Sequence, residues 1–94
     1  MGLSYKELAI KTLISEENTP LKIYDIWQIA KRKGYNKQLN SIGLTPENTL
    51  SAALIRSIEN DEGIFVCSGS PNKYRISVKY LKECKKWQLL LYSL

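Results

Sequence analysis

Two short strand patterns flank a run of turn-forming residues, and three helical patterns precede them in the chain. The run, Ser-Gly-Ser-Pro-Asn at residues 68–72, is rich in the residue types that form tight turns. Residues 64–67 have the character of a buried strand, and residues 73–77 alternate between polar and apolar side chains. The sequence therefore predicts a β-hairpin. In a chain of 94 residues, this hairpin and the helices must share one small core.

The first two helices are indicated by the residues at their ends. Ser4 and Glu7 have the spacing of a capping box, which predicts a helix from about Tyr5 to Ser15. A second apolar stripe predicts a helix over about residues 23–33. Gly34 follows it, where a left-handed residue commonly ends a helix.

The remaining segments follow from proline positions and periodicity. Residues 20–22 predict a short extended segment, compatible with a single-bridge strand. Thr45-Pro46 has the form of an N-cap followed by a first helical proline, which predicts a third helix over about residues 46–60. We expect residues 35–44 to be a polar loop, and helical periodicity returns from residue 78 onward.

The predicted order is helix, short strand, helix, helix, hairpin, helix. A mainly α chain with three helices and a small β-hairpin has the winged helix-turn-helix arrangement, which we expect over residues 4–78. Residues 79–94 then form a C-terminal helix with an apolar seam. We expect this seam either to pack back on the domain or to make a dimer contact; its residues are Tyr80, Cys84, Trp87, Leu91 and Leu94.

Composition excludes most enzyme classes. The chain has no histidine, which removes the commonest general base and metal ligand, and two cysteines cannot hold a structural zinc ion. No pattern of a metal-dependent nuclease is visible. We therefore expect no catalytic residue, no metal and no cofactor. No signal peptide or apolar run of membrane-spanning length is present, so we expect a soluble protein, in a bacterial cytoplasm rather than a nucleus.

Charge is unevenly distributed along the chain. The total is 14 basic and 9 acidic residues. Residues 31–37 hold four basic residues and no acid, and residues 73–94 hold six basic residues and one acid. The third predicted helix, by contrast, carries only Arg56 against Glu47 and Glu59. Basic clusters of this kind attract a polyanion, so double-stranded DNA is the partner we expect.

The same charges assign roles within a helix-turn-helix. The second helix of the pair enters the major groove, and Asn and Arg side chains can each form two hydrogen bonds to a base edge. Because the third helix has few cations, we expect the loop and the hairpin to supply phosphate contacts, with modest affinity and steep salt dependence. We expect the cations to converge into one stripe beside the third helix. The predicted DNA-binding residues are Lys37, Thr45, Asn48, Thr49, Ser51, Arg56, Lys73 and Arg75.

Several motifs in this order resemble the HARE-HTH family, the winged helix of additional-sex-combs-like chromatin proteins, homeobox-associated proteins and restriction endonucleases. The resemblance covers about residues 4–78 and implies DNA binding, with recognition of modified bases or chromatin state. Leu44 departs from it, since the family often has a basic or small residue there. The motifs are Pro20-Leu21, Ile23-Tyr24-Asp25-Ile26-Trp27, Lys33-Gly34, Gly43-x-Thr45-Pro46-Glu47-x-Thr49-Leu50, Ala53-Leu54, Arg56, Ile58, Phe65-Val66 and Pro71-x-x-Tyr74-x-Ile76.

The sequence leaves three functions open. The first is a non-catalytic DNA-binding module. The second is a winged helix that binds a protein, which the low charge of the third helix and the apolar Ile55 favour. The third is the DNA-recognition domain of a restriction endonuclease, in which the C-terminal helix leads to a nuclease or other effector domain.

Overall fold

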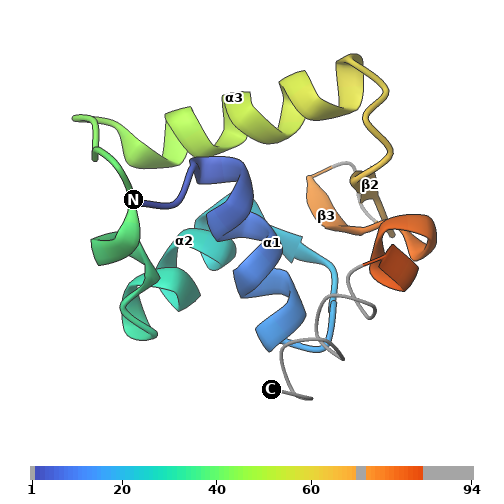
Figure 1. The fold of residues 1–94 in the computed structure, drawn as a ribbon, viewed down its shortest axis with the longest axis horizontal. Helices are drawn as coiled ribbons and strands as arrows, with labels where there is room; N and C mark the ends of the chain where they lie inside the picture. The colour runs from blue at the N-terminus through green and yellow to red at the C-terminus, as the bar shows by residue number, and fades with distance from the viewer. Residues whose placement is uncertain (1, 70–71, 84–94) are drawn as a thin grey trace.

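Three α-helices and a small antiparallel sheet make up the domain in a computed structural model that describes residues 2–69 and 72–83 (Figure 1). The helices are α1 (Tyr5–Ser15), α2 (Ile23–Arg32) and α3 (Pro46–Glu59), with a short 3-10 helix, η1 (Tyr35–Gln38), between α2 and α3. The bounds of α1 are those predicted from its capping box, and α2 and α3 each end one residue early. The mainly α fold with a small sheet is confirmed.

Helix ends follow the predicted chemistry at two places. The Ser4 hydroxyl accepts a hydrogen bond from the Glu7 backbone, and the Glu7 carboxylate accepts one from the Ser4 backbone, so the capping box is confirmed. Gly34 has a φ of 79°, the left-handed conformation predicted after α2.

The sheet contains one strand more than the hairpin. Its strands are β1 (Leu21–Lys22), β2 (Phe65–Cys67) and β3 (Lys73–Ile76), in the order β1-β3-β2 with both pairings antiparallel. The hairpin prediction is confirmed, and the short extended segment before α2 forms β1, one of the two edge strands. β3 therefore occupies the centre of the sheet.

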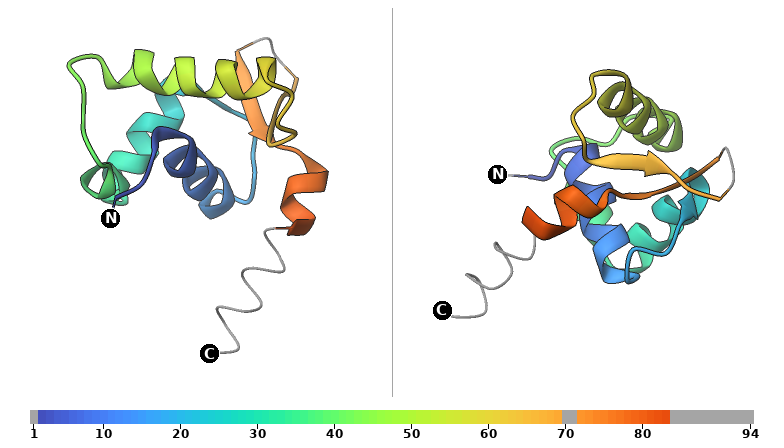
Figure 2. Two further views of the ribbon diagram at one scale, coloured as in Figure 1. Left: turned by 45° about the horizontal axis from the view of Figure 1, so that its top comes forward. Right: turned by 90° about the vertical axis from the view of Figure 1, so that its right-hand side faces the viewer.

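The core lies where the three helices meet the inner face of the sheet (Figure 2). Alternation along β3 buries Tyr74 and Ile76, while Lys73 and Arg75 point to the other face. Ile26 and Trp27 of α2 are buried, and the Trp27 ring stacks with Tyr5 at 6.3 Å between centroids. The other fully buried aliphatic side chains include Leu8, Leu13, Leu50 and Leu54.

Residues 35–39 are more ordered than the polar loop predicted over residues 35–44, which corrects that part of the prediction, whereas residues 40–44 form no helix or strand. Lys37 donates its backbone N–H to the Gly34 carbonyl within η1. Leu3 and Leu39 then form an isolated β-bridge, with the Leu3 N–H bonded to the Gln38 carbonyl at 2.6 Å. This structure was not predicted because it depends on contacts with the segment before α1, and the sequence around η1 gives no sign of those contacts.

The chain is helical again at residues 78–83, and Tyr80 and Leu81 pack against the core. The rest of the predicted seam, Cys84, Trp87, Leu91 and Leu94, lies outside the described residues. None of the helices within residues 2–69 and 72–83 has the length and apolar content needed to cross a membrane.

Candidate nucleic-acid interface

The surface of α3 opposite the core is a ridge of small and polar side chains. Leu50 and Leu54 are fully buried on the inner side of the helix. On the outer side, Asn48, Ala52 and Ile55 are exposed at the spacing of one helix face. Glu59 ends this outer ridge, which we define as Asn48, Ala52, Ile55 and Glu59, and Ser51 lies half-buried beside it.

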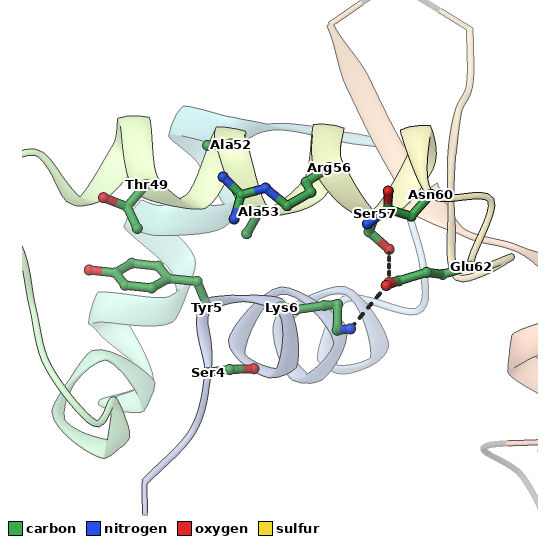
Figure 3. A pocket seen from close by; sticks show the side chains of 10 residues that line it. All are labelled: Ser4, Tyr5, Lys6, Thr49, Ala52, Ala53, Arg56, Ser57, Asn60 and Glu62. Carbon is green, nitrogen blue, oxygen red and sulfur yellow. Dashed lines mark hydrogen bonds and ion pairs between the residues drawn. The ribbon is translucent and has the colours of Figure 1, made fainter.

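Two of the predicted α3 residues lie on a different flank. Arg56 and Thr49 line an open groove of about 400 Å³ between α3 and the start of α1, where Tyr5 forms the opposite wall (Figure 3). No hydrogen bond or ion pair holds the Arg56 guanidinium within the described part of the chain. The structure therefore separates Arg56 and Thr49 from Asn48 and Ser51 around the axis of one helix.

An acid at the far end of this groove is tied to both walls (Figure 3). The Ser57 hydroxyl donates to the Glu62 carboxylate at 2.6 Å, and the Lys6 ammonium donates to the same oxygen at 3.1 Å. The hydrogen bond from Ser57, followed by the contact with Lys6, lowers the pKa of Glu62 below its ordinary value. This contact neutralises Lys6, so among the described residues that line the groove Arg56 is the cation left without an acid.

The start of α3 differs in one detail from its prediction. Thr45 occupies the N-cap position, but its side chain makes no capping hydrogen bond; instead, the Thr49 hydroxyl donates to the Thr45 carbonyl at 3.2 Å. The residues before it expose apolar side chains: Leu44 is fully exposed and Ile42 is 52% exposed. Thr45 and Asn48 thus lie at an end of α3 that is open to solvent and locally apolar.

The two basic residues of the hairpin share the outer face of the sheet. Lys73 and Arg75 alternate with the buried Tyr74 and Ile76, and both are half-buried. One Arg75 Nη donates to the Ile76 carbonyl at 3.2 Å, which holds the guanidinium close to β3. On the inner face, burial raises the pKa of the Tyr74 phenol.

Lys37 lies apart from these cations. It is exposed on η1, beside Gly2 and Asn40 near the N-terminus. Figure 1 and the left view of Figure 2 place η1 at one end of the molecule and the hairpin near the other. The expectation of one stripe that includes Lys37 is therefore wrong. Lys37 belongs to a separate surface.

Sequence reasoning missed a basic residue on the sheet. Lys22 of β1 pairs directly with Lys73 of β3, so both side chains point to the outer face. The polar character of a two-residue strand gives no periodicity from which this placement could be found. The position of Lys22 follows from the register of β1 against β3, and this register joins segments that are distant in the chain.

A helix pair, a third helix with a free outer ridge, and an antiparallel hairpin beside it define a winged helix-turn-helix domain. The model of the HARE-HTH family, described as an ASXL and restriction endonuclease HTH domain, matches residues 3–76. The chain belongs to this family, whose domains are assigned to DNA binding. No curated protein and no solved structure gives a significant match to the chain.

Proposed function

We propose that this protein binds double-stranded DNA without catalysing a reaction, with the outer ridge of α3 in the major groove and the basic hairpin on the phosphate backbone. The observation that carries the proposal is the free outer ridge of α3 combined with two basic residues on β3 that no described acid neutralises. Helix α2 and the core hold the inner side of α3, so the ridge is the part of this helix left to contact a ligand.

The ridge has the size and chemistry of a base-reading surface. The major groove is about 12 Å wide and admits an α-helix. Ala52 allows close approach, while the Asn48 amide can form two hydrogen bonds with adenine. The exposed Ile55 fits the same site, because an apolar side chain can contact the thymine methyl group.

The flanks of α3 would face the two DNA strands. Arg56 and Thr49 line the groove between α3 and the start of α1, whereas Lys73 and Arg75 lie on β3 and do not line that groove. Lys73 and Arg75 would therefore contact one backbone, while Arg56 and Thr49, in the groove beside α1, would contact the other. Since α3 has more acidic than basic residues, most of the affinity would come from these flanking cations.

A mobility-shift titration on duplex DNA at two salt concentrations tests the proposal. We expect retardation that weakens steeply with salt and is lost in the double variant Lys73→Glu/Arg75→Glu. The matched control is Lys31→Glu/Lys33→Glu, which makes the same change in charge at exposed positions near the end of α2. Loss of binding in both double variants, or no retardation of the wild type at low salt, would contradict the proposal.

A protein-binding function is the second candidate, and the loop before α3 favours it. Leu44 and Ile42 are exposed there, and Ile55 is a further exposed apolar side chain on α3 itself. Exposed apolar side chains that cluster are typical of protein interfaces. A wild-type protein that fails to retard duplex DNA at low salt would support this candidate.

The proposal also covers what the DNA-binding domain is joined to and whether it forms a dimer. We infer that DNA binding directs an attached effector, such as a transcription regulator or the nuclease of a restriction endonuclease, the enzyme class that the family's description names. Dimerisation through the C-terminal helix is a further proposal, and multi-angle light scattering of the full chain tests it. A monomer mass at micromolar concentration would contradict dimerisation.

A further inference from the structure

A third cation joins the two basic residues of the hairpin on the outer face of the sheet. Lys22 lies directly opposite Lys73 in the antiparallel register of β1 and β3. Directly opposed residues point to the same face, and Arg75, two residues along β3, shares it. The basic surface of the hairpin therefore continues across the central strand onto β1.

Lys22 occupies a position that is unfavourable within the isolated domain. Like charges directly opposite each other destabilise a sheet, and Lys73 is its partner. Lys22 is also the N-cap residue of α2, where its side chain makes no capping hydrogen bond and its charge opposes the helix dipole. A Ser, Thr, Asp or Asn would avoid both costs. A residue that breaks two local preferences without compensation is expected at a functional site.

No acid compensates for these charges in residues 2–69 and 72–83. The ion pair found there joins Lys6 to Glu62, on the other side of α3. Asp25, in the first turn of α2, is exposed and forms no ion pair with Lys22 among these residues. Arg75 donates to a backbone carbonyl, which leaves its positive charge unneutralised.

We propose that Lys22, Lys73 and Arg75 form one phosphate-binding surface and that Lys22 contacts the DNA backbone, an inference that rests on the proposed function. A phosphate placed over this face would offset the repulsion between the two lysines. The contact surface would then include the edge strand before α2 as well as the hairpin, and Lys22 would act as a phosphate contact that carries no sequence information.

The test compares the wild type with Lys22→Gln, Lys73→Gln and the control Lys33→Gln, which removes an exposed lysine at the end of α2. Binding to a labelled mixed-sequence duplex is followed by fluorescence anisotropy between about 50 and 200 mM salt. We expect Lys22→Gln to weaken binding about five- to tenfold at about 100 mM salt and to reduce the slope of log K against log salt by about 0.9. The Lys33 variant should match the wild type.

Thermal melting adds a readout that separates this role from a structural one. Removing the like-charge pair should leave the melting temperature of Lys22→Gln unchanged or raise it by about 1–4 °C. A variant that binds less tightly and is no less stable supports the proposal. Wild-type affinity in Lys22→Gln, with weaker binding in Lys73→Gln, would overturn the role of Lys22 and leave the proposed DNA-binding function standing. A wild type that does not bind duplex DNA would overturn the proposed function together with this inference.

Discussion

The side-chain amide of Asn18 pairs with both backbone polar groups of Ile76. Its Nδ2 donates to the Ile76 carbonyl at 3.0 Å, and its Oδ1 accepts from the Ile76 N–H at 2.7 Å. Backbone pairing between β1 and β3 stops at Leu21, because the N–H of Thr19, two residues earlier, donates to the Glu16 carbonyl instead of to Ile76. Asn18 supplies the next two hydrogen bonds in place of a strand. It thereby fixes the segment that presents Lys22 beside the hairpin.

Replacing Asn18 with glycine should destabilise the domain by about 1–3 kcal/mol, because it leaves the N–H of the buried Ile76 without a partner and removes one of the two hydrogen bonds that the Ile76 carbonyl accepts. Glycine suits this position, since Asn18 has a φ of 58°. Glu17→Gly is the matched control, because Glu17 has nearly the same φ, 57°, and makes no such pair of bonds. Urea unfolding followed by circular dichroism measures both. Equal effects of the two variants would exclude a role for the amide.

The contact between Glu62, Ser57 and Lys6 predicts a pH dependence of stability. Because the pKa of Glu62 is lowered in the folded protein, the contact stabilises the fold at neutral pH. This contribution is lost as the pH falls below the ordinary glutamate value of about 4.3 and through the lower folded value. Glu62→Gln should therefore melt at a lower temperature than the wild type at neutral pH, with a difference that shrinks in acid.

Melting curves recorded from neutral to acidic pH check this prediction. Glu59→Gln is the control, since it removes a carboxylate from the last turn of α3 that forms no ion pair in the described residues. A difference between Glu62→Gln and the wild type that stays constant over the whole pH range would show that the carboxylate charge does not stabilise the fold.

The positions of Asn48 and Arg56 predict two different effects on DNA binding. Asn48→Ala removes a candidate base contact, so it should relax the preferred DNA sequence, at a cost of about 1–3 kcal/mol on the best site, without changing the salt dependence. Arg56→Gln removes a candidate phosphate contact, so it should weaken binding to all sequences and reduce the salt slope by about 0.9.

Selection from a random-sequence duplex pool, followed by anisotropy titrations on the selected site, distinguishes the two effects. Ser51→Ala provides a second ridge-side variant for comparison. A changed sequence preference in the Arg56 variant, with none in the Asn48 variant, would reverse the orientation of α3 that we propose.

Local signals were sufficient to predict most of the fold. The capping box of Ser4 and Glu7, the Thr45-Pro46 start of α3 and the left-handed Gly34 each depend on neighbours a few residues away. The hairpin likewise follows from the alternation of residues 73–76 around a turn. These features are readable because the residues that specify them are adjacent in the chain.

The features that shape the site depend on distant contacts, so they could not be predicted. The Asn18–Ile76 pair joins residues 58 positions apart, and the register of β1 likewise places Lys22 opposite Lys73, far along the chain. The bridge between Leu3 and Leu39 fixes η1 and carries Lys37 away from the hairpin. The expectation from the sequence placed Lys37 and Lys73 in one stripe of cations, whereas in the folded domain Lys22 is the neighbour of Lys73.

The location of the DNA-contacting surface is tested most directly by nuclear magnetic resonance. An isotope-labelled sample of the full chain is titrated with duplex DNA at low salt, and backbone amide shifts are followed residue by residue. We predict the largest shifts at Asn48, Ser51 and Ile55 on α3 and at Lys73 and Arg75 on β3, with no change at residues 35–38 of η1. Shifts confined to η1 or to the loop with Ile42 and Leu44 would contradict the account.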